Sequence, residues 1–191
     1  SCSVPSWPCE SGKEVAAGYR CRMTKHGKPT ELHTFEIDGV LYDSQPPTEA
    51  PSSWLLSAHS LAGHGQPGFD TKWILEGVVQ ARRSILNPSV VTVLLMGRPL
   101  HVEMDKAVRT LLRLADLRFD HVQLKPVSLP VPTPTYKVLS IQQWLLEYPT
   151  ILGITFFDPD PESVQLVKEV AGRAGRTCVA PQVSSSSPSP G

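Results

Sequence analysis

The sequence predicts a three-layer, Rossmann-like α/β fold, with a parallel sheet, helices on both faces and a small insertion after the first strand. Strand and helix signals alternate four times between residues 31 and 180, the order expected for parallel strands joined by right-handed crossovers. The runs 89–96 and 150–157 are mostly apolar and β-branched or aromatic, which is typical of strands buried on both faces. A chain of 191 residues is long enough for one such domain.

Five short apolar runs predict the strands, at 31–37, 89–96, 120–124, 150–157 and 177–180. The first helix is predicted from Asp70 to a stop at Asn87-Pro88, because apolar residues recur there every three or four positions. The other three helices are predicted at 101–115, at 135–148, and from 160 to a glycine exit at 172 or 175.

The composition divides the chain into three parts. Residues 1–30 form an N-terminal extension without periodicity, 31–180 form the α/β domain, and 181–191 form a Ser/Pro-rich tail. The chain begins with Ser1 rather than Met, which we interpret as a sign that the chain either lost a leader by processing or is a piece of a longer chain. A disulfide among Cys2, Cys9 and Cys21 is expected only in an oxidising compartment.

The balance of charges disfavours several classes of partner. The 18 basic and 18 acidic residues cancel, so we expect no nucleic-acid partner and no binding to an anionic membrane. No apolar run reaches the roughly 18 residues of a membrane span, so no transmembrane segment is predicted. Pro-rich extensions at both ends favour contacts with other protein subunits instead.

Polar residues follow the predicted strands where each one ends. They are Asp38, Gly97-Arg98, Lys125, Asp158 and Asp160. In parallel α/β sheets, sites form where loops leave the carboxyl ends of the strands, so these residues are expected to converge on one crevice.

Their order resembles a known family. The segments that carry the resemblance are "FEIDGVLYDSQPP" (35–47), Trp54, "GFDTKW" (68–73), "TVLLMGRPL" (92–100), "FDHVQLKP" (119–126), "TYK" (135–137) and "ITFFDPDPESVQLV" (154–167). Together they are similar to the haloacid-dehalogenase-like (HAD) phosphohydrolases, in particular the Swiss Army Knife RNA repair-like branch. The resemblance covers about 35–170.

The resemblance implies a role for each matched position. Glu36 stands at the nucleophile position, Asp38 at the general acid/base, and Lys125 or Lys137 at the charge-neutralising lysine. Met96, Gly97 and Arg98 match the phosphate-binding segment. If the site is active, Mg²⁺ ligands are expected among Glu36, Asp38, Asp158 and Asp160.

Three of these positions depart from the family pattern. Glu36 replaces an aspartate, and its extra methylene displaces the carboxylate by about 1 Å, which can cost about 10²-fold in rate. Met96 replaces a threonine and has no proton to donate to a phosphate. Pro159 separates Asp158 from Asp160, where the branch has an adjacent acidic pair, so the metal corner is altered as well.

Structural interpretations of the same residues remain open. Asp38-Gly39 also fits a simple turn, Asp160 a helix N-cap, and Arg98 a salt bridge within the fold. Three tryptophans fit the core better than a base-stacking surface: Trp54, Trp73 and Trp144. His59 and His64 in the insertion are a weak metal signal, because no third ligand accompanies them.

The expected function is that of a degenerate, non-catalytic HAD-fold protein that acts as an accessory subunit of a larger complex, in the mitochondrion by preference. No cofactor is expected in that case. The first alternative is an Mg²⁺-dependent phosphohydrolase acting on phosphate monoesters such as nucleic-acid ends. The second alternative is a phosphate- or anion-binding module at Gly97-Arg98.

Overall fold

The computed structural model describes residues 28–44, 53–61 and 72–183. Five parallel strands form one sheet in the order β3-β2-β1-β4-β5. The strands are β1 (Glu31–Phe35), β2 (Val90–Leu100), β3 (His121–Pro126), β4 (Gly153–Phe157) and β5 (Thr177–Val179). The predicted class of fold, a Rossmann-like parallel sheet, is confirmed.

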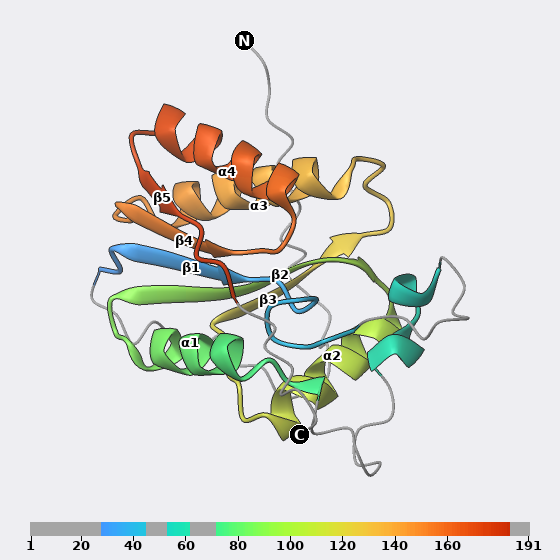
Figure 1. The fold of residues 1–191 in the computed structure, drawn as a ribbon. Coiled ribbons are helices and arrows are strands. Elements are labelled where there is room, and N and C mark those ends of the chain that lie inside the picture. Colours follow the sequence, from blue (N-terminus) through green and yellow to red (C-terminus); the bar gives the residue numbers. More distant parts are fainter. Residues whose placement is uncertain (1–27, 45–52, 62–71, 184–191) are drawn as a thin grey trace, which may run out of the picture.

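Helices cover both faces of this sheet. Helices α1 (Leu75–Leu86) and α2 (Val102–Leu114) lie on one face, and α3 (Thr133–Glu147) and α4 (Pro161–Arg173) lie on the other (Figure 1). Each face has its own apolar core, because side chains alternate between the two faces of a strand. Along β2, Leu94 and Met96 belong to the α1/α2 core, whereas Val93 and Leu95 belong to the α3/α4 core.

The insertion after β1 contains two short 3₁₀ helices, η1 (Trp54–Leu56) and η2 (Ala58–Leu61). The sequence shows no periodicity there, so neither element was predicted. The described helices include none that is long and apolar enough to cross a bilayer. The expected cysteine pairing at positions 2, 9 and 21 lies outside the described residues, and Cys178 on β5 is a free thiol.

The predicted ends of two strands differ from the structure by three residues or more. β2 does not stop at residue 96 but continues through Arg98 to Leu100, and its pairing with β3 resumes at Pro99 after a register shift. β4 begins at Gly153 rather than at residue 150, because the preceding residues form a turn in which the Ile151 amide donates to the Tyr148 carbonyl at 3.1 Å.

The order of strands places the carboxyl ends of β1, β2 and β4 side by side. β1 is central, and its last residue, Phe35, is in register with Leu94 of β2 and with Phe157 of β4. The chain segments that follow Phe35 and Phe157, and the end of β2, therefore leave the sheet side by side. This edge is where the polar residues singled out in the sequence lie.

Candidate functional site

The segment after β1 turns sharply and directs two acidic side chains to different partners. The Glu36 amide still donates to the Phe157 carbonyl at 2.9 Å, so the backbone is held at the sheet edge. Beyond it, the amides of Leu41 and Tyr42 both donate to the Ile37 carbonyl and close a tight turn. Gly39 has a φ of +73° in this turn, a conformation that glycine adopts without strain.

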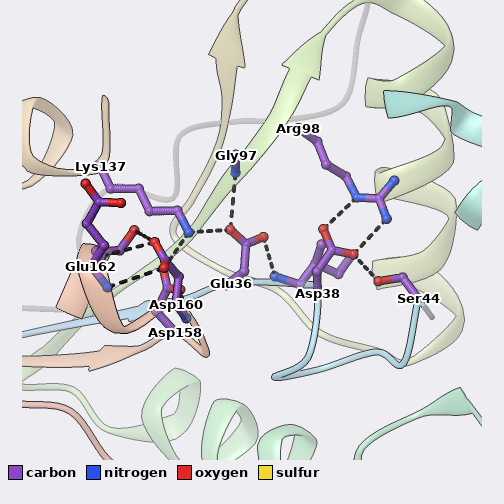
Figure 2. A network of polar contacts seen from close by, with 11 residues as sticks. Glu36, Asp38, Ser44, Gly97, Arg98, Lys137, Asp158, Asp160 and Glu162 are labelled. Atoms are coloured by element: carbon purple, nitrogen blue, oxygen red, sulfur yellow. Dashed lines mark hydrogen bonds and ion pairs between the residues drawn. The ribbon is translucent and has the colours of Figure 1, made fainter. Parts of the chain in front are cut away.

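Glu36 belongs to a buried row of three charges. The Lys137 ammonium lies 2.7 Å from Oε2 of Glu36 and 2.5 Å from Oδ2 of Asp158 (Figure 2). Lys137 comes from the second turn of α3, and Asp158 directly follows β4. All three side chains are buried, with Lys137 only 3% exposed. One cation therefore serves two carboxylates in a site that water scarcely reaches.

Burial and the attraction between opposite charges shift the pKa values of these three side chains. Burial raises the pKa of Glu36 and of Asp158, and the positive charge of Lys137 only partly offsets that rise. Burial alone would lower the pKa of Lys137, but the two carboxylates outweigh it and the pKa is raised. Lys137 therefore stays protonated, and the row carries one carboxylate more than its single cation can neutralise.

Asp38 faces the opposite way and is held by Arg98. Nε of Arg98 donates to Oδ2 of Asp38 at 2.9 Å, and Nη2 donates to Oδ1 at 2.7 Å, so the pair is bidentate (Figure 2). The hydroxyl of Ser44 also donates to Oδ1. Arg98 itself is 2% exposed. The alternative in which Arg98 closes a salt bridge within the fold is the arrangement that the structure has.

Arg98 also fixes the insertion after β1. Its Nη1 donates to the Leu55 carbonyl in η1 at 2.9 Å and to the Ser60 hydroxyl in η2 at 2.5 Å. The guanidinium thus joins three segments: the end of β2, the turn after β1 and the insertion. We call this group the Arg98 clasp. Sequence reasoning missed Ser44, Leu55 and Ser60, because serine and backbone carbonyls carry no signal of such a role.

The remaining candidates lie in different surroundings. The Gly97 amide donates to Oε2 of Glu36 at 3.2 Å, so it joins the site. Met96 is fully buried in the α1/α2 core. Lys125 lies on β3, half-buried and in register with Pro99, and makes no ion pair within the described residues. Of the two candidate lysines, Lys137 is the one that contacts the acidic residues.

Asp160 serves as the N-cap of α4. Its carboxylate accepts from the amides of Glu162 and Ser163, at 3.3 and 3.1 Å. Burial would raise its pKa, but the hydrogen bonds from Ser163 outweigh this and the pKa is lowered. The alternative of an N-cap is therefore confirmed, and Asp160 faces the first turn of its helix.

The predicted core positions of the tryptophans can be checked for two of the three, and both lie at an apolar core. Trp144 is 8% exposed and belongs to the α3/α4 core, and Trp73 packs against the α1/α2 core. The side chains of Trp54 and His59, and all of His64, lie outside what the structure describes.

The acidic residues do not fit a divalent cation in this arrangement. A metal shared by Glu36 and Asp158 would need the position that the Lys137 ammonium occupies. Both oxygens of Asp38 accept from Arg98. Within residues 28–44, 53–61 and 72–183, no group of three or more acidic, histidine or cysteine side chains is placed to hold a metal ion. The expected Mg²⁺ ligands are thus each paired with a cation or a helix end of the chain itself.

Comparison with known families identifies the class of protein that this fold represents. Residues 50–182 match the family described as HAD domain family 1 in Swiss Army Knife RNA repair proteins. The chain belongs to this HAD family, because the match covers well over half of its 191 residues. The match begins at residue 50, so it does not include Glu36 and Asp38. The place of these two residues in the site rests on the structure.

Solved structures share the fold at low sequence identity. A chain in the structure of the Pnkp1/Rnl/Hen1 RNA repair complex has a TM-score of 0.52 and 12% identity, over 88% of this chain and 47% of that chain. The HAD domain of effector protein Lem4 from Legionella pneumophila has a TM-score of 0.52 and 15% identity, over 81% of this chain and 86% of that one. Such identities establish the fold alone.

This chain spans about half the length of the RNA repair chain that it matches. No curated protein sequence matches it.

Proposed function

We propose that this protein is a non-catalytic HAD-fold domain that acts as an accessory subunit of a larger protein assembly. The observation that carries the proposal is the pairing of every acidic residue at the expected catalytic positions with a cation of the chain itself. Glu36 shares Lys137 with Asp158, and Asp38 is held on both oxygens by Arg98.

The Asp38–Arg98 pair opposes acid/base catalysis. A general acid or base must reach the proton that it transfers, within about 2.6–3.2 Å or through one water. Releasing Asp38 for that task would leave the Arg98 guanidinium, which is 2% exposed, without its carboxylate. Although the Asp38 side chain is 24% exposed, leaving the buried guanidinium without a partner costs up to about 3–5 kcal/mol, so the paired state is favoured.

The accessory role rests on two further considerations. A chain with this fold is present in a Pnkp1/Rnl/Hen1 RNA repair complex, so HAD domains do occur within multi-protein assemblies. The equal numbers of basic and acidic residues suit contact with other proteins better than attraction of phosphate substrates.

A phosphatase assay tests the proposal. With Mg²⁺ and p-nitrophenyl phosphate, the full chain should release nitrophenol no faster than its Asp38→Asn variant. Asp105→Asn on α2 serves as the matched control, since Asp105 pairs with Arg109 at the surface, away from the candidate site. Turnover in the wild type and in Asp105→Asn that is lost in Asp38→Asn would overturn the proposal. An assembly role further requires that other proteins co-purify with the native chain; a lone monomer would contradict it.

The second candidate is an Mg²⁺-dependent phosphohydrolase acting on phosphate monoesters such as nucleic-acid ends. It is favoured by the convergence of Glu36, Gly97, Lys137 and Asp158 at one sheet edge. Trapping a covalent phosphoryl group on Glu36 would establish this activity. The anion-binding alternative has less support, because an anion at Arg98 would have to displace Asp38. The mitochondrial location stays a prediction.

A further inference from the structure

Helix α1 carries exposed apolar side chains on its outer side. Leu75 is 75% exposed, Val79 36% and Leu86 76%. They are four and seven residues apart, so they lie along one line of the helix, and we call them the α1 stripe. The opposite side of the helix faces the sheet and carries its buried residues, Gly77, Val78, Ala81 and Ser84. A helix that covers a sheet normally exposes polar residues on its outer side, so the stripe is unusual.

Positive charges border the α1 stripe. With 3.6 residues per turn, Arg82 projects to one side of the stripe and Arg83 to the other. Both arginines are exposed. Nη2 of Arg82 donates to the Ala115 carbonyl at 3.0 Å, which uses one of the five N–H groups of the guanidinium. Glu76, the acidic residue of α1, already has an interaction within the chain. The charges offered to a partner beside the stripe are therefore those of the two arginines.

The α1 stripe is separate from the candidate functional site. It shares no residue with that site, and because α1 covers one face of the sheet, its outer side points away from the strands (Figure 1). Single exposed leucines are common on protein surfaces, whereas apolar side chains gathered together and bordered by polar residues mark surfaces that bind a partner. The stripe is a surface of the second kind.

Two classes of partner fit this surface poorly. Arg82 and Arg83 lie near the middle of the stripe, so contact with a second copy about a two-fold axis would bring each arginine close to its own counterpart. An anionic membrane is not attracted by the chain as a whole, because its 18 basic and 18 acidic residues cancel. Helix α1 also has no aromatic residue of the kind that helps helices to enter a membrane interface.

We propose that the α1 stripe binds an amphipathic helix of another protein whose apolar side chains are bordered by glutamate or aspartate. Apolar side chains three or four residues apart would pack against the stripe, and the acidic side chains would pair with Arg82 and Arg83. The stripe is about 16 Å long at 1.5 Å per residue, which matches about three turns of a partner helix. This surface goes beyond the proposed function, since it requires nothing of the candidate site.

¹H–¹⁵N NMR titration of the full chain with designed peptides tests the surface. The probe is a helical peptide of about four turns, with leucine at every third or fourth position and glutamate beside the leucines. The control peptide has lysine in place of each glutamate. Saturable shifts of the Leu75, Val79 and Leu86 amides are expected with the glutamate peptide, and the lysine peptide should bind at least about fivefold more weakly at low salt. Equal binding of the two peptides, or shifts confined to other elements, would overturn the proposal.

Variants connect the binding to the stripe and to its charges. Leu86→Ser should weaken the glutamate peptide by about five- to tenfold, since a leucine that is partly buried in a contact contributes about this much. Its matched control is Leu146→Ser on α3, where the leucine is 80% exposed. Arg83→Glu should weaken the peptide by about two- to fivefold at low salt, and Arg173→Glu, likewise an exposed arginine in the last turn of a helix, should not. The proposal is wrong if Leu86→Ser and Arg83→Glu bind the peptide like their controls.

Two further measurements address the other partners. Sedimentation velocity of the chain alone detects self-association, and flotation with phosphatidylcholine/phosphatidylserine vesicles detects membrane binding. A dimer or vesicle binding that is lost in Leu86→Ser and kept in Leu146→Ser would assign the stripe to a second copy or to a membrane, against the proposal. Phosphatase activity bears only on the candidate site: an active chain that still binds the glutamate peptide would refute the proposed function and leave the α1 stripe as a binding surface.

Discussion

Replacing Lys137 with methionine removes the only cation from the buried row and leaves the side-chain length nearly unchanged. Glu36 and Asp158 then face each other with side chains that are 7% and 2% exposed and with no positive partner. Loss of one member of a buried ion pair costs about 3–5 kcal/mol. For a domain of this size, each kcal/mol lowers Tm by about 2–4 °C, so Lys137→Met should melt about 10 °C lower at neutral pH.

The pH dependence of this loss distinguishes a charge effect from a packing effect. Without Lys137, the raised pKa values of Glu36 and Asp158 rise further, because burial is no longer opposed. An acid whose pKa is higher in the folded state than in the unfolded state binds more protons in the folded state. The free energy of unfolding therefore falls as the pH rises between the two pKa values. The deficit of Lys137→Met should therefore be largest above neutral pH and should shrink toward about pH 5, where the carboxylates take up protons.

Urea unfolding followed by circular dichroism at the two pH values measures the deficit. Lys125→Met is the matched control, since Lys125 is half-buried and makes no ion pair among the described residues. The control should stay within about 0.5 kcal/mol of the wild type. A loss in Lys137→Met below about 1 kcal/mol, or a deficit that grows on acidification, would refute the reasoning.

Three further outcomes are expected. Arg98→Met should lose about 3–5 kcal/mol and should speed amide exchange at 55–60, whereas Arg118→Met, whose ion pair is exposed, should do neither. Gly77→Ala should unfold the domain readily, because a Cβ there would overlap a backbone carbonyl, whereas Gly172→Ala in α4 meets no atom and should gain about 0.5–1 kcal/mol. About 10 mM Mg²⁺ should leave the Tm of the wild type unchanged in a thermal-shift assay, since a cation that bound the native state would raise it.

The sheet and its helices could be predicted because their signals are local. The apolar run of β2 and the Asp160 cap of α4 depend only on neighbouring residues. The extension of β2 through Arg98 could not be predicted, because Pro99 interrupts the strand signal and the strand continues only through a register shift against β3.

The site could be predicted only in part. The expected convergence holds for Asp38, Arg98 and Asp158, since the alternation of elements predicts parallel strands, and parallel strands end on the same side of the sheet. The choice between Lys125 and Lys137 could not be made from spacing. It depends on which side chain of α3 or β3 reaches Glu36, and that follows from how α3 packs on the sheet.

The Arg98 clasp has a consequence for how this sequence tolerates change. Asp38 and Arg98 stand sixty positions apart, yet each neutralises the other in a place where a lone charge is expensive. In a deep mutational scan, nearly every single replacement at position 38 or 98 should reduce the amount of folded protein. Paired apolar replacements at both should recover folded protein far more often, so the two codons should be epistatic.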